Sequence, residues 1–509
     1  LHKEYRRQRQ MCIRDRYILN PDYHFKNDID RVVMYSSKQV KYNASVEWIG
    51  YIHPFQAMIL SLFTDNKTLA EHIDEIAKHF HLSPNAVYDM ILPYINNSGY
   101  CFTVTDSNKV IFPENTLIPL SQIEAEDMHY DFSISDLQCN NVDLTPDRMH
   151  RSPQSLLFML TNKCVTNCKY CYADKKTKCI ELDTEKILAL IEEAKQLKMS
   201  YIDIIGGEVF CKKDWDIILH KLVDSGLTPS YISTKVPINV SIAEKLYKTG
   251  DNNVIQISLD ILDEDKLIDL IECKKGYLKS IKDGIDILQK YGFKIQIDTI
   301  LTKHNSNKSD ITELYNYIKQ IKNLVYWEVR VPELSIYTPQ TFSEIQATKK
   351  DLTEICSFIK SELIPDKGCT IYVSDEAIEE IYKKGKPNDQ CFKGGSCGIL
   401  ENRLFVLPDG KVTLCEQLYW HPQFILGDLK EQTLAEIWQS PRAKALFEMG
   451  QTQFRENSAC TKCHIFEFCR KNHRRCLVKV IKAYGEKNWD YPDPRCQYAP
   501  SIQTNLIYK

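Results

Sequence analysis

Three cysteines within eight residues constrain this chain more than any other feature of its sequence. Cys164, Cys168 and Cys171 have C-x3-C-x2-C spacing and closely follow the apolar run 156–160. Thiolates are the preferred protein ligands of iron–sulfur clusters, so three of them can hold three irons of a four-iron cluster. Because the motif has no fourth cysteine, the fourth iron would be open to another ligand. The alternative is a structural zinc knuckle.

The spacing, with the aromatic Tyr170 before the last cysteine, resembles the motif of the radical S-adenosylmethionine (SAM) superfamily. In that family the open iron binds SAM through its amino and carboxylate groups. The resemblance implies a SAM-binding [4Fe–4S] cluster on Cys164, Cys168 and Cys171, which would be the catalytic ligands.

The composition indicates a folded protein of several domains. The chain has 509 residues, of which 43% are apolar, and none of its apolar runs approaches the length of a membrane span. A net charge of −3 gives no indication of a nucleic-acid or membrane partner. Nineteen cysteines without a secretory signal favour metal binding in a reducing, cytoplasmic location over disulfides.

Residues 1–16 are set aside from the fold prediction. They carry six Lys or Arg and lack the apolar segment of a signal peptide. The stretch Met11–Asp15 resembles a translated sequencing-adapter end. We interpret residues 1–16 as a non-native or disordered leader.

Residues 17–110 are predicted to form a small winged-helix-like domain. Thr68 and Glu71 have the spacing of a helix capping box, and Pro93 should end the helix that precedes it. Strand and helix patterns predict two strands followed by three helices, at 32–35, 45–49, 54–63, 68–80 and 83–92.

This order resembles the peptide recognition element of ribosomal-peptide biosynthesis, the domain type of the pyrroloquinoline-quinone peptide chaperone. The resemblance implies that a leader peptide adds as a strand to the edge of its sheet. The alternative is a DNA-binding winged helix. Because Lys78 is the sole Lys or Arg in the second and third predicted helices, nucleic-acid binding is disfavoured. Residues 111–150, which are polar and contain three prolines, are predicted to be a linker.

Residues 151–335 alternate strand and helix patterns, which predicts a parallel sheet. With the cysteine motif after the first strand, this region resembles the partial (β/α)6 barrel of radical SAM enzymes, an α/β fold. The active sites of barrels lie at the C-terminal ends of their strands. The predicted strands are 156–160, 201–205, 231–233, 254–259, 294–301 and 325–331.

Polar residues at three further strand ends match SAM-binding positions of the family. Gly206-Gly207-Glu208 follows the second strand, where the family has a GGE motif that receives the SAM amino group. Glycines let the backbone approach a ligand closely. The resemblance also implies that Ser233, Ser258 and Asp260 contact SAM, whereas ordinary buried or capping roles are the alternative.

One position departs from the family pattern. Glu272 stands where the family often has an Arg that holds the SAM carboxylate. Lys274 and Lys275 are candidate substitutes, because either supplies a point charge. Which residue holds the SAM carboxylate is therefore left open.

A bridging region is predicted at 336–390, a second metal region at 391–500 and a tail at 501–509. Leu407–Gly410 is typical of a hairpin turn. The spacing of eight cysteines resembles the SPASM extension of radical SAM peptide modifiers, and eight thiols suffice for two further [4Fe–4S] clusters. The resemblance assigns one auxiliary cluster to Cys391, Cys397, Cys415 and Cys476 and the other to Cys460, Cys463, Cys469 and Cys496.

Two alternatives remain open in this region. His473 occupies the position where the family usually has its seventh cysteine, so either His473 or Cys476 completes the first auxiliary set. We favour Cys476, because thiolates predominate as cluster ligands. For the Cys460–Cys469 segment the alternative is structural zinc.

The resemblance over residues 17–500 implies an oxidoreductase that reductively cleaves SAM with an electron from a small donor such as ferredoxin or flavodoxin. The 5′-deoxyadenosyl radical would then modify a ribosomal precursor peptide of leader plus core, with oxidative cross-linking as the expected reaction. One alternative is a sulfatase-maturase-like enzyme that forms formylglycine, although such enzymes carry Asp where this chain has Glu416. The other is a non-catalytic peptide-binding scaffold, which the complete three-cysteine motif disfavours.

We predict that anaerobic reconstitution loads about twelve irons per chain, because three plus eight thiols can hold three four-iron clusters. Replacing Cys164, Cys168 and Cys171 together by Ala should leave about eight irons and abolish SAM cleavage. Iron and sulfide assays with 5′-deoxyadenosine quantification measure both outcomes. A wild-type content of about four irons would contradict the two auxiliary clusters.

Overall fold

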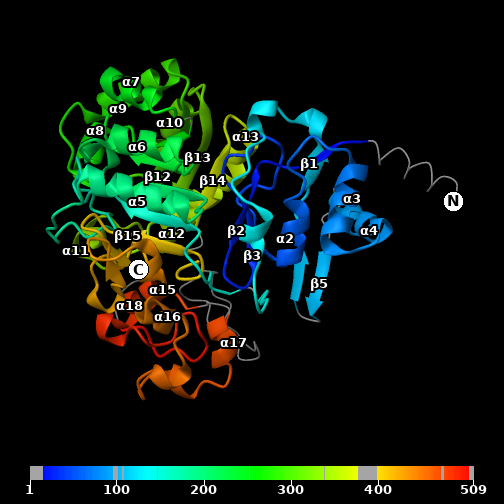
Figure 1. Cartoon of the computed structure of the whole chain (residues 1–509). Coiled ribbons are helices and arrows are strands. Elements are labelled where there is room, and N and C mark those ends of the chain that lie inside the picture. The colour runs from blue at the N-terminus through cyan, green and yellow to red at the C-terminus, as the bar shows by residue number, and fades with distance from the viewer. Residues whose placement is uncertain are drawn as a thin grey trace. The chain divides into compact units, whose positions relative to one another are not determined.

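The chain divides into two units, Leu1–Ser152 and Pro153–Lys509, each with its own internal packing. Figure 1 shows the computed structural model. Within its described part no helix is long and apolar enough to cross a membrane. The structure describes residues 15–95, 101–105, 108–145, 147–251, 253–337, 339–375, 398–471 and 475–503.

The N-terminal unit has strands followed by three helices, as the sequence predicts, but the strand predicted at 45–49 lies at Ile49–Ile52, and the strand Tyr23–Asn27 was not predicted. A three-stranded antiparallel sheet precedes three helices, and a hairpin follows them. A further antiparallel pair joins the start of the unit to its later part. The elements are β1 (Tyr17–Leu19), β2 (Tyr23–Asn27), β3 (Val32–Ser36), β4 (Ile49–Ile52), α2 (Pro54–Leu60), α3 (Leu69–Phe80), α4 (Pro84–Ile95), β5 (Cys101–Thr105), β6 (Asn108–Ile111) and β7 (Leu117–Pro119).

Local signals predict some boundaries of this unit and miss others. The capping box of Thr68 and Glu71 forms at the start of α3 as expected. Pro93, however, lies inside α4, so the expectation that it ends the helix is wrong. Ile91 and Tyr94 on either side of it are buried in the core of the unit, and this packing outweighs the lost backbone hydrogen bond.

Residues 111–145 and 147–150 pack against the N-terminal sheet. Leu137 and Leu144 belong to the same hydrophobic core as β2 and β3. The guanidinium of Arg31 is fully buried, pairs with Asp28 at 3.1 Å and donates a hydrogen bond of 2.7 Å to the carbonyl of Arg148. The segment predicted as a linker is thus tied to this unit by burial and by a charged contact.

The C-terminal unit contains the six expected barrel strands, and all of their pairings with one another are parallel. They are β8 (Ser155–Met159), β9 (Tyr201–Ile205), β10 (Tyr231–Thr234), β11 (Val254–Ser258), β12 (Lys294–Ile300) and β13 (Leu324–Arg330). The helices between them flank the strands (Figure 1). These helices are α5 (Thr184–Gln196), α6 (Trp215–Asp224), α7 (Val240–Lys248), α8 (Glu264–Ile271), α9 (Tyr277–Lys290) and α10 (Lys308–Ile318).

The barrel sheet is longer than the sequence alone indicates. A seventh parallel strand, β14 (Ile371–Ser374), pairs with β13 and comes from the segment predicted to bridge two domains. Between β9 and β10 the described ladder is interrupted, and Asp203 accepts a 2.8 Å hydrogen bond there from the N–H of Ser230. The helices before β14 are α11 (Pro339–Ile345), α12 (Lys349–Phe358) and α13 (Ile364–Asp366).

The C-terminal region extends this sheet at its other edge. β15 (Arg403–Val406) runs parallel to β8, and β16 (Lys411–Thr413) and β17 (Gly427–Asp428) continue antiparallel. The predicted hairpin turn forms between β15 and β16, with Gly410 at a φ of +89°. The helices that follow are α15 (Leu434–Gln439), α16 (Pro441–Phe447), α17 (Phe466–Lys471) and α18 (Leu477–Tyr484).

Candidate iron–sulfur and SAM site

The three clustered cysteines lie on one loop at the C-terminal end of β8. Cys168 is buried, and Cys164 and Cys171 are partly exposed. The hydroxyl of Thr166 lies 3.6 Å from Sγ of Cys164 and 3.3 Å from Sγ of Cys168. The loop therefore presents the thiols at the rim where barrel enzymes bind their substrates.

Backbone contacts with the end of α8 hold the cysteine loop. The N–H of Asn167 donates to the carbonyl of Ile271 at 2.9 Å, and the N–H of Lys169 donates to Leu270 at 3.0 Å. Glu272, the left-handed C-cap of α8, accepts a 2.6 Å hydrogen bond from the side-chain amide of Asn167. The residue that departs from the family pattern thus contacts the cysteine loop itself.

A buried hydrogen-bonded group connects the loop with two strands. The hydroxyl of Tyr170 donates to Asp260 at 2.5 Å and accepts from Nζ of Lys235 at 2.9 Å. The other oxygen of Asp260 accepts from the N–H of Ile300 at 2.8 Å. Burial alone would lower the pKa of Lys235, but Cys168 and Asp260 raise it above its ordinary value. Sequence reasoning missed Lys235, because no local pattern marks it.

The GGE segment packs against the start of the cysteine loop. The N–H of Gly207 donates to the carbonyl of Thr161 at 2.8 Å. A Cβ on Gly207 would lie 2.4 Å from the carbonyl oxygen of Lys163. Gly207 is thus required by the close approach of two protein backbones.

Glu208 is buried at the end of β9. One carboxylate oxygen accepts from the hydroxyl of Thr234 at 3.0 Å, and the other accepts from the N–H of Lys235 at 2.7 Å. Burial raises the pKa of Glu208, and these hydrogen bonds oppose the rise. Ser258 is the last residue of β11, and Ser233 is the last but one of β10. Both side chains are partly exposed. The predicted SAM residues thus lie at the C-terminal ends of β9, β10 and β11.

Charged side chains from two neighbouring strands meet beside this rim. Nη2 of Arg330 on β13 contacts Asp298 on β12 at 2.9 Å and Glu328 at 2.8 Å. Burial raises the pKa of Asp298 to about 6. Burial also raises the pKa of Glu416, whereas the positive charges of Arg403 and Arg330 lower it. Sequence reasoning did not single out Asp298, Glu328 or Arg330, since period-two alternation does not show which face of a strand points inward.

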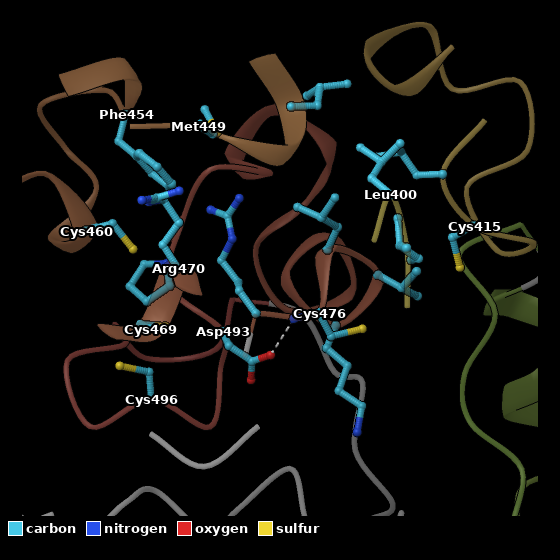
Figure 2. Close-up of a pocket in the computed structure, with 18 of the residues that line it drawn as sticks. Leu400, Cys415, Met449, Phe454, Cys460, Cys469, Arg470, Cys476, Asp493 and Cys496 are labelled. Carbon is cyan, nitrogen blue, oxygen red and sulfur yellow. Dashed lines mark hydrogen bonds between the residues drawn. The ribbon is translucent and has the colours of Figure 1, made fainter. Parts of the chain in front are cut away.

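A second group of thiols lines a cavity of about 310 Å³ in the C-terminal region. Apolar side chains such as Leu400, Met449 and Phe454 complete its wall (Figure 2). Cys391, Cys397 and His473 lie outside the described residues, so the choice between His473 and Cys476 stays open. The thiols at the cavity are Cys415, Cys460, Cys463, Cys469, Cys476 and Cys496.

The labelled thiols fall into two groups in Figure 2. Cys460, Cys469 and Cys496 lie on one side of the cavity, and Cys415 and Cys476 lie on the other. The assignment of these thiols to two ligand sets stays a prediction of the family resemblance.

Two polar side chains anchor the backbone around these thiols. The amide of Gln451 donates to the carbonyls of Cys460 and Cys463 at 3.0 and 2.8 Å. Asp493 accepts from the N–H of Cys476 at 3.0 Å, while its own carbonyl accepts from the N–H of Cys496 at 2.8 Å. The thiols are therefore held in place by hydrogen bonds of the protein itself.

The thiol chemistry fits iron–sulfur clusters. Burial raises the pKa of Cys460 and Cys476, and that of Cys496 to about 11, so these thiols are protonated until a metal displaces the proton. Within the described ranges, no three His, Cys, Asp or Glu side chains converge on a single ion position. The ligands of a four-iron cluster each bind a different iron, so convergence on one point is not required.

Two families match this chain by profile. The radical SAM superfamily matches residues 158–318, and SPASM, an iron–sulfur cluster-binding domain, matches residues 397–464. A barrel with a thiol loop and a separate thiol cavity defines an iron–sulfur enzyme. These matches assign it further: the chain is a radical SAM enzyme with a SPASM extension.

Characterised relatives have different activities. The PqqA peptide cyclase of Granulibacter bethesdensis is 21% identical over 69% of this chain and 88% of its own length. The probable GTP 3′,8-cyclase of Methanosarcina mazei is 25% identical over 54% of this chain and 81% of its own length. The GTP 3′,8-cyclase of Marinobacter nauticus is 29% identical, and the match covers 34% of this chain and 53% of that enzyme.

A solved structure matches nearly the whole chain. SuiB of Streptococcus suis, bound to SAM, has a TM-score of 0.60 and 16% identity, and the match covers 94% of this chain and all of SuiB. A second SuiB structure, bound to the precursor peptide SuiA, has a TM-score of 0.61 and covers 94% of this chain. At this identity the likeness establishes the fold: a partial barrel with a SPASM extension and an N-terminal β domain.

We predict that Gly207→Ala displaces the cysteine loop, because the added Cβ would lie 2.4 Å from the carbonyl of Lys163. The variant should lose about four of its irons and most of its SAM cleavage. Iron assay and 5′-deoxyadenosine quantification measure the two losses. Gly292→Ala is the matched control, because its φ of +80° imposes strain while nothing lies within 4 Å of the new Cβ. Equal iron contents in the two variants would contradict the role of this contact.

Proposed function

We propose that this protein reductively cleaves SAM and uses the resulting radical to modify a ribosomally made precursor peptide, with oxidative cross-linking as the reaction. The observation that carries the proposal is the cysteine loop at the barrel rim, with Glu208 buried just after the end of the next strand, β9. The second thiol site and the separate N-terminal unit support it, because a net oxidation needs an electron acceptor and a leader needs a docking surface.

Each residue of the first site has a role in this proposal. Cys164, Cys168 and Cys171 would hold the cluster, and Glu208 would receive the SAM ammonium group through a charge-assisted hydrogen bond. Asp260 would act chiefly by holding Tyr170, since both of its oxygens accept protein hydrogen bonds. With an electron from a small donor protein, cluster and SAM would supply a 5′-deoxyadenosyl radical that takes a hydrogen atom from the peptide.

Charged strand residues would orient the core peptide beside the SAM site. The ion pairs of Arg330 with Asp298 and Glu328 fix three side chains across two neighbouring strands. Burial raises the pKa of Glu416, and the charges of Arg403 and Arg330 oppose the rise. A carboxyl group with a raised pKa is a candidate to exchange a proton with a bound peptide.

The auxiliary thiols would serve the oxidation. One set would be Cys460, Cys463, Cys469 and Cys496, and the other would combine Cys415 and Cys476 with Cys391 and Cys397. Formation of a cross-link removes two hydrogen atoms from the peptide. One leaves as the atom taken by the radical. The other leaves as a proton, which solvent or a basic side chain would accept, and as an electron, which an auxiliary cluster would accept.

The leader would bind to the N-terminal sheet at β4, which pairs with β3 on one side. Ile49, the first residue of β4, is 37% exposed, and Val46, just before the strand, is 57% exposed. Ile111 on β6 is 58% exposed. An edge strand offers backbone hydrogen bonds, and exposed apolar side chains beside it offer a surface for alternate side chains of an added strand. Tethering the leader raises the local concentration of the core at the barrel.

We predict that Glu208→Gln weakens SAM binding by about tenfold, because a charge-assisted hydrogen bond is roughly twice as strong as a neutral one. Equilibrium dialysis with labelled SAM measures the affinity, and the absorbance of the first cluster should be unchanged. Glu192→Gln, on the exposed face of α5, is the control for loss of one carboxylate. A Glu208→Gln enzyme with wild-type SAM affinity would contradict the assigned role.

The function is tested by sequencing the reading frames next to this gene for a short precursor, and by incubating the peptide so found anaerobically with enzyme, SAM and dithionite. The expected result is stoichiometric 5′-deoxyadenosine and a peptide lighter by two hydrogens, read by mass spectrometry. A gain of an aldehyde at Cys or Ser would instead indicate formylglycine formation. SAM cleavage without any change in peptide mass would contradict the proposal.

We predict that Ile49→Glu reduces conversion of limiting, leader-bearing peptide at least fivefold, because a charge replaces an apolar contact at the docking edge. Cleavage of SAM in the absence of peptide should be unchanged. Val142→Glu, at a side chain that is 41% exposed in the same unit, is the matched control. Equal conversion by both variants would show that the leader does not use this edge.

A further inference from the structure

One guanidinium lies among the thiols of the C-terminal cavity. Arg475 directly precedes Cys476 and lines the same cavity as Cys460 and Cys469. Burial lowers the pKa of Arg475, and the thiols of Cys460 and Cys469 are the first of the groups that oppose this effect. The geometry therefore places a cation next to the thiol set Cys460, Cys463, Cys469 and Cys496.

An aromatic platform holds this guanidinium. Its central carbon lies 4.8 Å from the ring centre of Phe454, and Phe454 packs edge-to-face against Phe466 at 5.2 Å. Nη1 of Arg475 donates a long hydrogen bond of 3.4 Å to the carbonyl of Tyr491. A cation stacked on a fixed ring keeps its position whatever occupies the cavity.

The carboxylates near Arg475 already have other partners. Asp490 accepts from the backbone N–H of Arg455 at 3.0 Å and from its Nε at 2.9 Å. Asp493 pairs with Arg495 at 2.9 Å and accepts from the N–H of Cys476. Among the residues that the structure describes, no carboxylate lies at ion-pair distance from Arg475. Its charge is left facing the thiols.

Arg475 is partly buried. A cation withdrawn from water without an anionic partner is costly, and a protein retains one where an anion balances it. Four thiolates around a four-iron cluster make a group of net negative charge, and reduction adds a further negative charge. A fixed cation beside it stabilises the reduced form more than the oxidised form. Net charge and hydrogen bonding near a cluster are among the factors that set its reduction potential.

We propose that Arg475 is a fixed cation that raises the reduction potential of the cluster held by Cys460, Cys463, Cys469 and Cys496. The inference rests on the auxiliary clusters of the proposed function and adds the residue that favours electron acceptance at one of them. Arg475 acts through its charge on the cluster and is therefore a tuning residue, with no contact to the peptide.

The cavity supplies its own control. Arg470 also lines it, but its guanidinium pairs with Glu467 through Nη2 at 2.8 Å and Nε at 3.1 Å. The pair has no net charge and is partly exposed to solvent, which screens it. Removing Arg470 should therefore change the potential far less than removing Arg475, although both side chains are arginines of the same cavity.

The test is a redox titration of the reconstituted, full-length holoenzyme, followed by electron paramagnetic resonance. The signal that changes on addition of SAM reports the first cluster and is the internal reference. Arg475→Met should shift one SAM-insensitive signal to lower potential by at least a tenfold change in its reduction equilibrium, about 59 mV for one electron. Arg475→Lys should stay within threefold of wild type, as should Arg470→Met.

The possible outcomes separate the inference from the proposed function. Unshifted signals in Arg475→Met, or equal shifts in Arg475→Met and Arg470→Met, would overturn the role of Arg475. About four irons and no SAM-insensitive signal in the wild type would overturn the auxiliary clusters themselves. If the Arg475→Met variant loses about four irons, its potential cannot be compared, and the titration of Arg475→Lys tests the inference instead. A retained cluster within threefold of wild type supports a charge effect, and loss or an equal shift contradicts it.

Discussion

The cysteine loop depends on a contact between two backbones that leaves no room for a side chain. Gly207 at the end of β9 approaches the carbonyl of Lys163 so closely that a Cβ would lie 2.4 Å from it. The same residue donates its N–H to Thr161 at the start of the loop. The loop is fixed at its other side by α8, through Asn167 and Lys169. Three thiols on a short loop can hold a cluster only if that loop keeps one conformation, and these two attachments restrict it.

The register of the sheet fixes the second thiol site relative to the first. β15 pairs with β8 through Leu404 and Leu156, so the hairpin that leads to Cys415 is built on the strand that leads to Cys164. Between the two sites lies a small core in which Tyr419 contacts Tyr337 edge-to-face at 5.3 Å, with Cys171 packed against it. Close-packed side chains of this kind resist deformation. The separation of the two redox sites is therefore set by a sheet and a packed core.

The chemistry-bearing residues were largely predictable from local sequence, because cluster ligands come in short motifs. The sequence singles out Cys164 and the six cavity cysteines by spacing that resembles family motifs, and Glu208 by its resemblance to the GGE motif; their roles stay predictions. The hydrogen bonds that hold these residues in place could not be predicted, because Tyr170, Asp260 and Lys235 meet only after three separated segments fold together. The same holds for the pairings of β14 and β15, because their partner strands lie far away in sequence. Pro93 shows the converse, since a strong local signal was overridden by the burial of Ile91 and Tyr94.

Arg475 illustrates why buried charge is informative in a protein of this kind. An arginine next to a cysteine has no meaning as a sequence pattern, and its significance comes from what the fold places around it. Asp490 and Asp493 are satisfied by Arg455 and Arg495, which leaves one cation with thiols as its neighbours. Protonated thiols would leave that charge unbalanced, whereas a cluster of thiolates would balance it. Among the residues that the structure describes, negative charge in the cavity is what would balance Arg475, which links the stability of this region to occupancy of the metal site.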